Sequence, residues 1–571
     1  MPVTDAKKRK ATEPNAEVFT PPEVVSYMLA AVEKNRGQPI SFRDKTLEPS
    51  AGDGAFVRPL VRKITGSFKK EGLPWSHTAL DESLRAFEVN PALVERLRCI
   101  VVDELCAAGC PAGRAGELVS LWIRAEDFLV ADLPFEFDIV VGNPPYVRYD
   151  AIPKEKVLRY QRDYSSFKGR CDLFVPFIQR SLSLLSPTGV FCFICSNRFA
   201  KNDYGRRLRM FISGTFHVAL YLNLEHADVF GKDVAAYPAI LMVDRDRGQP
   251  TFAASVRDLS STPLSSFAFG ESPAFSRFPA WYCGGDPWST TDLEDWTFAR
   301  RIEKKLPLLV DSAPGTRFGI GVATGNDAVF VRPGPEPGIE PDCLLPLATG
   351  DDVRAGRIPG DSVLVNPFRN DDSGQLRLPG ERPGMDRYFE RHRAALETRF
   401  VARKKEWYRT IDRVSWSLFR SPKLLLPDIQ SGGIVGMDST GGVYPHHNLY
   451  WIVSDGWPLP ALAAILCSRF VTRQIRGFSS EMRGGSIRYQ AKNLERLRIP
   501  PRNAVEPAEE VLLRTAYLHG DGETINRIVE GIVARCLSEP DTKPVWPERA
   551  EQLLFAMEPP AKYLAKRQRE F

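Results

Sequence analysis

The ten residues from 137 to 146 constrain the fold more than any other stretch of the chain. They read Phe-Asp-Ile-Val-Val-Gly-Asn-Pro-Pro-Tyr. The run at residues 139–142, which follows Asp138, is typical of a strand buried on both faces, as in parallel sheets. The two prolines end the strand and stiffen the chain beyond it. The run therefore predicts an α/β fold in which Asn143 and Tyr146 lie at the carboxyl end of a strand, where open α/β sheets bind ligands.

A rigid amide beside an aromatic ring is suited to holding a planar amino group, such as the exocyclic amine of adenine. Two simpler interpretations stay open for this stretch alone. It could be an ordinary strand followed by a proline-rich turn, or an exposed ligand for a proline-recognising module.

The first half of the chain has the pattern of a nucleotide-binding sheet. Short apolar runs alternate with amphipathic stretches from about residue 44 to 245, which is typical of βαβ units. The pattern predicts a doubly wound, Rossmann-like sheet of seven strands. The expected strands cover residues 46–47, 84–89, 119–124, 137–141, 189–195, 218–224 and 239–243.

The loop after the first expected strand contains Gly52, Asp53 and Gly54. Glycines allow a tight turn and a close approach of ligand to backbone. Position 57 is Val and no Lys-Ser/Thr pair follows, so neither the dinucleotide fingerprint nor a phosphate-binding loop is present. A short acidic glycine loop favours a cationic ligand without phosphates over a pyrophosphate, and the sulfonium S-adenosylmethionine fits. A plain β–α connection is the alternative.

Acidic residues also end the next two expected strands. Glu88 could accept hydrogen bonds from both ribose hydroxyls of a cofactor. Asp127 could accept from a cofactor adenine amine, with Phe128 packed on the ring. The alternative for Glu88 is a solvated acid at a strand end.

Taken in order, these motifs resemble the gamma subgroup of N6-adenine DNA methyltransferases, the Taq-type methylases of restriction–modification systems. The resemblance covers about residues 17 to 245 and implies a class I S-adenosylmethionine-dependent fold. It implies that Asn143, Pro144, Pro145 and Tyr146 form the catalytic motif, in which the Asn143 oxygen and the Pro144 carbonyl accept the hydrogens of the target amine. The cofactor-binding positions that it implies are Thr20, Glu48, Gly52, Asp53, Gly54, Glu88, Asp127 and Phe128.

The same resemblance implies that Tyr146 and Phe230 stack on an adenine flipped out of duplex DNA. Tyr237 is the substitute for Phe230, and Phe230 could instead be a hydrophobic anchor of its loop.

The second half of the chain has a different residue pattern and resembles a mixed α+β target-recognition domain of the same family. Basic residues interleaved with rings and glycines suit contacts to phosphates and base edges, although a solvated basic face is the alternative. The expected DNA-binding residues are Arg403, Lys404, Lys405, Arg473, Arg476, Arg483 and Arg488. The predicted organisation is a disordered basic arm (1–16), a catalytic domain (17–245), a linker (246–300), a target-recognition domain (301–505) and a helical cap (506–571).

The rest of the composition indicates the compartment and the partners of the protein. No apolar run of about 18 residues suggests a membrane span, and the ten cysteines favour a reduced, cytoplasmic protein. The pair His446–His447 has no Cys or carboxylate near it in sequence, so no metal site is expected. A net charge of +5 permits double-stranded DNA as partner. We expect a monomer that protects DNA from a cognate restriction endonuclease. RNA methylation, protein-glutamine methylation and a combined restriction–modification enzyme are the alternatives.

Overall fold

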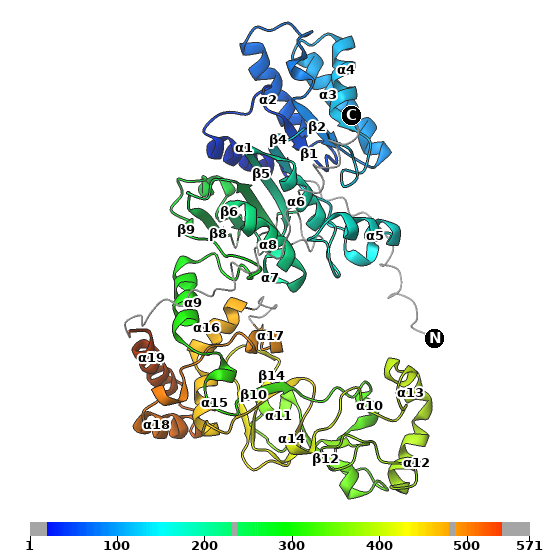
Figure 1. Ribbon diagram of the computed structural model, residues 1–571, viewed down its shortest axis with the longest axis vertical. Coiled ribbons are helices and arrows are strands. Elements are labelled where there is room, and N and C mark those ends of the chain that lie inside the picture. Colours follow the sequence, from blue (N-terminus) through cyan, green and yellow to red (C-terminus); the bar gives the residue numbers. More distant parts are fainter. Residues whose placement is uncertain are drawn as a thin grey trace, which may run out of the picture. The chain divides into compact units, whose positions relative to one another are not determined.

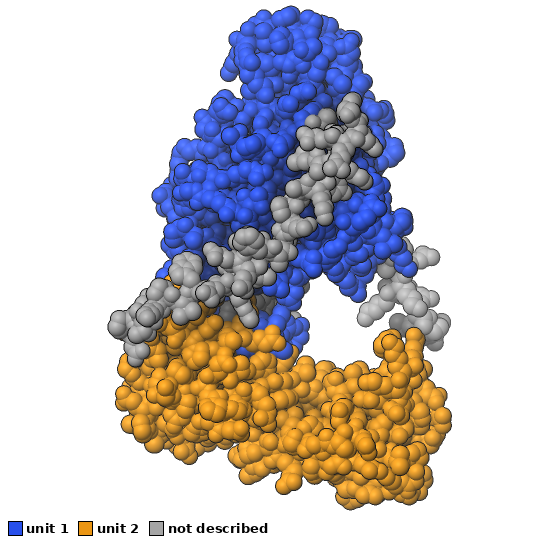
Figure 2. All heavy atoms as spheres, viewed as in Figure 1, with its two compact units in different colours: residues 1–300, 428–432, 473–494 blue, residues 301–427, 433–472, 495–571 orange. Residues whose placement is uncertain are grey.

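The computed structural model describes residues 20–538 apart from residues 134, 226, 228, 231–236, 257, 260 and 479–485. The predicted basic arm, the last 33 residues of the predicted cap and Arg483 therefore lie outside the described residues. The chain divides into two compact units, shown in Figure 2. Unit 1 comprises residues 1–300, 428–432 and 473–494, and unit 2 comprises residues 301–427, 433–472 and 495–571.

Unit 1 is built around a nine-stranded sheet with the order β3-β2-β1-β4-β5-β7-β6-β8-β9 (Figure 1). The first five strands pair in parallel, and β7 is antiparallel to both β5 and β6. The strands are β1 Thr46–Glu48, β2 Leu84–Phe87, β3 Ile123–Arg124, β4 Phe137–Gly142, β5 Leu185–Ser196, β6 His217–Asn223, β7 Pro238–Asp244, β8 Thr251–Ser255 and β9 Ser276–Phe278.

Helices cover both faces of this sheet, and the residues of β5 show how. Val190, Cys192 and Ile194 pack into one core cluster with helices α1 to α4. Their neighbours Phe191 and Phe193 point the other way, into a second cluster with α5, α6 and α8. The helices of this unit are α1 Pro22–Arg36, α2 Val57–Lys70, α3 Pro91–Ala107, α4 Ala112–Trp122, α5 Lys154–Asp163, α6 Phe174–Ser183, α7 Arg198–Lys201 and α8 Arg206–Thr215; α9 Leu293–Lys305 runs across the boundary between the units. The alternation with period two is what a doubly wound sheet requires, and the predicted fold class is confirmed.

Three features of the fold differ from the prediction. Residues 119–122 are the end of α4, so the third strand is only Ile123–Arg124. The segment predicted as a linker supplies β8 and β9, which lengthen the sheet beyond seven strands because β8 pairs in parallel with β6. Residues 428–432 and 473–494, expected in the target-recognition domain, group with unit 1, where β15 Ile429–Gln430 pairs with β19 Ile487–Arg488 beside α17 Ala491–Leu494.

Unit 2 contains two four-stranded sheets, with the orders β10-β18-β14-β16 and β11-β13-β12-β17. Their strands are β10 Arg317–Ile320, β11 Val331–Arg332, β12 Leu344–Ala348, β13 Val363–Val365, β14 Lys423–Pro427, β16 Gly436–Asp438, β17 Tyr444–Pro445 and β18 Leu449–Val453. The helices are α10 Asp327–Phe330, α11 Gly350–Arg354, α12 Pro383–Arg391, α13 Arg393–Glu397, α14 Trp416–Arg420, α15 Leu459–Cys467, α18 Pro507–Leu518 and α19 Gly522–Ser538; α16 Arg469–Phe478 crosses the boundary. Helices α18 and α19 pack on α15 within the same unit.

Candidate active site

The Asn-Pro-Pro-Tyr motif follows β4 directly, as the sequence predicts. Strand residues Ile139, Val140 and Val141 are fully buried, so the strand end is fixed by packing on both faces. The Asn143 side chain donates from Nδ2 to Oγ1 of Thr20, at 3.1 Å. Because this hydrogen bond fixes the position of the amide nitrogen, it also fixes the position of the amide oxygen, which can accept a hydrogen bond from a ligand.

A second hydrogen bond ties the motif to the loop after β1. The Ser50 hydroxyl donates to the Asn143 backbone carbonyl at 2.9 Å. Thr20 is itself buried and lies two residues before the start of α1. Asn143 is therefore held from two directions by segments that come earlier in the chain. Neither contact could be predicted from the sequence, although Thr20 and Ser50 both lie in or beside motifs identified in the sequence.

Tyr146 lies against Phe230. Their ring centroids are 6.1 Å apart with an interplanar angle of 71°, an edge-to-face pair. The Tyr146 hydroxyl is buried and has no hydrogen-bond partner among the described residues. Burial raises the pKa of this phenol well above its ordinary value. The raised pKa keeps this phenol protonated at neutral pH, and its ring lies against the ring of Phe230.

Tyr237, the substitute for Phe230, is occupied elsewhere. The guanidinium of Arg198 lies over its ring, 4.8 Å from the centroid. Its backbone has φ 45°, in the left-handed region that a residue with a large side chain rarely adopts. Its carbonyl accepts a hydrogen bond from the Asn197 N–H at 2.8 Å. Of the two rings, Phe230 is the one that contacts Tyr146.

Glu48 ends β1 and is 1% exposed. Neither carboxylate oxygen has a hydrogen bond of ordinary geometry to a described residue. Burial raises the pKa of Glu48 well above its usual value; the Ser50 backbone amide opposes the effect, and Glu88 adds to it. A buried carboxylate of this kind is costly unless a ligand supplies donors or positive charge.

Gly142, the last residue of β4, makes room for this carboxylate. A Cβ on Gly142 would lie 2.4 Å from Oε1 of Glu48, closer than any atom contact allows. The glycine that looked like a plain strand residue is thus required by the neighbouring strand.

The loop after β1 is tied to the end of β2. Ala51 N–H donates to the Phe87 carbonyl at 2.8 Å, and Gly52 N–H donates to Oε2 of Glu88 at 3.0 Å. Gly52 and Gly54 have φ of 54° and 86°, which suits glycine. Asp53 Oδ1 accepts from the Ala55 N–H within the turn, at 3.2 Å. The other oxygen of Glu88 accepts from the N–H groups of Val89 and Asn90, at 2.8 and 2.7 Å.

Asp127 and Phe128 lie in surroundings that the sequence did not indicate. Burial alone would raise the pKa of Asp127, but hydrogen bonds from Tyr160 (2.6 Å) and Lys156 (2.9 Å) outweigh it, and the pKa is lowered. The Phe128 ring is 1% exposed and packs between Phe87 and Phe177, at centroid distances of 5.5 and 5.4 Å. In this conformation Phe128 is a core residue, so its ring is not open for stacking on a cofactor.

The described DNA-binding candidates are divided between the two units. Arg403, Lys404 and Lys405 are exposed together at the end of a 3₁₀ turn in unit 2, and Arg476 is exposed on α16. Arg473, on α16, forms an ion pair with Asp295 on α9, with 2.8 Å between Nε and Oδ1. Arg488 forms an ion pair with Asp428.

His446 and His447 have no Cys or carboxylate near them in sequence, but they have a carboxylate near them in the structure. The structure brings Asp327, more than a hundred residues earlier, to 3.1 Å from His446. Spacing along the chain could not reveal a partner that the fold of unit 2 supplies.

Comparisons with known proteins identify relatives along nearly the whole chain. The family model described as Eco57I restriction-modification methylase matches residues 117–230. The type II methyltransferase M.XhoI of Xanthomonas vasicola is 35% identical, over 89% of this chain and 95% of its own. M.PaeR7I of Pseudomonas aeruginosa is also 35% identical, over 92% of this chain and 94% of its own. The structure of the type IIL restriction-modification enzyme MmeI in complex with DNA shares the fold, with a TM-score of 0.52 at 11% identity; the match covers 91% of this chain and 73% of that one.

The residues present also fit the cofactor of this family. The buried carboxylate of Glu48, the positive-φ glycines and the loop held by Glu88 all lie where β1 and β2 end. Among the described residues, no helix is both long and apolar enough to cross a bilayer. By its similarity along nearly its whole length to M.XhoI and M.PaeR7I, the chain belongs to the type II methyltransferases of restriction–modification systems, which methylate DNA at specific sites with S-adenosylmethionine.

Proposed function

We propose that the acceptor is the N6 amine of adenine, flipped out of duplex DNA. The observation that carries the proposal is the Asn143–Thr20 hydrogen bond, which turns the amide so that its oxygen is the acceptor. An exocyclic amine has two hydrogens, and the motif offers two acceptors for them, Asn143 Oδ1 and the Pro144 carbonyl, at about 2.9 Å when bound.

Two hydrogen bonds of this kind draw the amine out of conjugation with its ring. The nitrogen lone pair is then localised and directed at the methyl donor. Pro145 restricts the backbone that carries the Pro144 carbonyl, so positioning supplies much of the acceleration. Tyr146 and Phe230 flank the base, which must leave the helix at a cost of a few kcal/mol to reach the site.

S-adenosylmethionine supplies an electrophilic methyl group on its sulfonium. We assign its binding to Glu48, Gly52, Asp53, Gly54 and Glu88, whose carboxylates and loop amides can hold a ribose and a cationic ligand. Thr20 and Asp127 act at its border, since both already have partners within unit 1.

Unit 2 is proposed to recognise the DNA sequence, with Arg403, Lys404 and Lys405 contacting phosphates. We expect a monomer that acts in the cytoplasm beside a separate restriction endonuclease of the same specificity. The ten cysteines, all free, suit a reducing compartment.

Transfer of labelled methyl groups to duplex DNA, RNA and protein, followed by mass spectrometry of the digested product, tests the proposal. We expect N6-methyladenine in duplex DNA alone. N4-methylcytosine, or methylated RNA or glutamine, would contradict it. DNA cleavage in buffer containing Mg²⁺ would instead indicate a combined restriction–modification enzyme.

The variant Asn143→Ala tests the role of the amide in this reaction. Methylation should be lost while S-adenosylmethionine still binds, because the amide acts on the acceptor and not on the donor. Cofactor titration separates this result from misfolding, in which binding is lost as well.

A further inference from the structure

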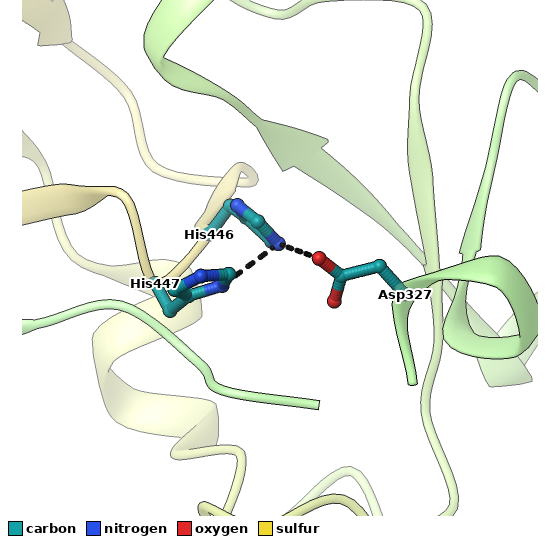
Figure 3. Close-up of side chains that lie close together, drawn as sticks. All are labelled: Asp327, His446 and His447. Atoms are coloured by element: carbon teal, nitrogen blue, oxygen red, sulfur yellow. Dashed lines mark hydrogen bonds and ion pairs between the residues drawn. The ribbon is translucent and has the colours of Figure 1, made fainter. Parts of the chain in front are cut away.

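Three metal-ligating side chains converge in unit 2, within that unit's own fold. Asp327 is the first residue of α10, and His446 and His447 directly follow β17. One ligand atom from each residue lies within 4.8 Å of the other two (Figure 3). Figure 3 shows both rings and the carboxylate directed toward one another.

The surrounding backbone fixes this arrangement. His446 N–H donates to the Ala348 carbonyl at 2.9 Å, and His447 N–H donates to the Val322 carbonyl at 3.1 Å. The second oxygen of Asp327 accepts from the Thr324 hydroxyl at 2.5 Å. Orientation of ligands by such outer contacts is typical of metal sites.

Hydrogen bonding alone does not satisfy the three groups well. Nε2 of His446 lies 3.1 Å from Oδ2 of Asp327 and 3.0 Å from Nδ1 of His447. A single proton on Nε2 can point along only one of these directions, and if Nε2 instead accepts from an Nδ1–H of His447, the electron pairs of Nε2 and the Asp327 oxygen face each other. A cation about 2.0–2.2 Å from each atom would remove this conflict, because ligands around such an ion are themselves slightly more than 3 Å apart.

We propose that Asp327, His446 and His447 bind a divalent transition metal of the zinc type. Two imidazoles and one carboxylate suit such an ion, whereas Mg²⁺ and Ca²⁺ prefer sites made of oxygen alone. His446 is buried, and Asp327 and His447 are exposed, so the remaining coordination position faces water. The ion joins the start of α10 to the loop after β17 and stabilises unit 2, apart from the methyl-transfer chemistry of unit 1.

The test is titration of untagged, chelator-treated full-length protein with Zn²⁺, followed by calorimetry. We expect one equivalent to bind, and His447→Ala and Asp327→Asn each to weaken binding at least tenfold. Both changes lie at exposed positions, and circular dichroism checks their folding. His519→Ala, which removes an exposed histidine of the same unit, should leave binding unchanged.

Two further readouts make the result decisive. Saturating Zn²⁺ should raise the Tm of the wild-type protein and leave that of His447→Ala unchanged. Co²⁺ should give a spectrum without the thiolate charge-transfer absorption that binding to exposed cysteines produces. The proposal is overturned if the wild-type protein binds no Zn²⁺ at micromolar concentration, or if both variants bind it as tightly as wild type.

Discussion

The rings of Tyr146 and Phe230 meet edge to face, with centroids 6.1 Å apart, although they come from the end of β4 and from the loop after β6. The contact brings together the two aromatic residues that the family resemblance assigns to the target base. It also distinguishes Phe230 from Tyr237, because the ring of Tyr237 contacts the guanidinium of Arg198 instead.

Removing either ring should impair catalysis, and removing the Tyr146 hydroxyl should not. Stacking on an aromatic side chain contributes about 1–3 kcal/mol per base, so Tyr146→Ala and Phe230→Ala should each lower kcat/KM by roughly 10- to 100-fold. Tyr146→Phe should stay within about threefold of wild type, because the buried hydroxyl has no partner among the described residues. Steady-state kinetics on duplex DNA measure both effects; equal losses for Tyr146→Phe and Tyr146→Ala would show that the hydroxyl is used.

Thr20→Val should reduce kcat while cofactor affinity stays nearly constant. Valine has the shape of threonine but cannot accept from Asn143 Nδ2, so the hydrogen bond from the amide to residue 20 is lost. The loss of one such hydrogen bond is worth about 1 kcal/mol or somewhat more, or roughly tenfold in rate. Thr20→Ser keeps the acceptor and should retain most of the activity. A rise in the Kd of S-adenosylmethionine with unchanged kcat would instead place Thr20 against the donor.

The cofactor-free protein should lose stability as pH rises above the ordinary glutamate range. The folded-state pKa of Glu48 is raised, so the folded chain holds a proton that the unfolded chain has already released. Stability therefore falls between the unfolded pKa and the higher folded pKa, and is fully present below both. Glu48→Gln should flatten this dependence and raise the Tm at pH 8, yet weaken binding of S-adenosylmethionine. Thermal melts from pH 5 to 8 measure the slope, and equal slopes for both proteins would contradict the assignment to Glu48.

Gly142→Ala should destabilise unit 1 through its effect on Glu48. The added methyl group would overlap Oε1 of that carboxylate, and overpacking of this kind typically costs about 1–3 kcal/mol. Shortening the neighbour in the double variant Gly142→Ala/Glu48→Ala should recover part of the loss, a non-additivity that denaturant unfolding of the two single variants and the double variant detects. Additive losses would mean that the two positions do not interact.

The sequence by itself determined the local elements of this protein. An apolar run that ends in Asn-Pro-Pro-Tyr encodes a strand buried on both faces with a fixed end, and the glycines at 52 and 54 encode the turn after β1. Such features depend on the period of side chains and on backbone preferences over a few residues, so they can be read without knowing the rest of the fold.

Only the tertiary structure decided which distant residues meet. It brought Thr20 to Asn143, buried Glu48 over Gly142, enclosed Phe128 in the core, added β8 and β9 to the sheet and carried Asp327 to His446. These relationships depend on how helices cross over the sheet and how loops close over many residues. Local periodicity carries no information about them, because the same strand and turn patterns are compatible with many pairings of distant segments.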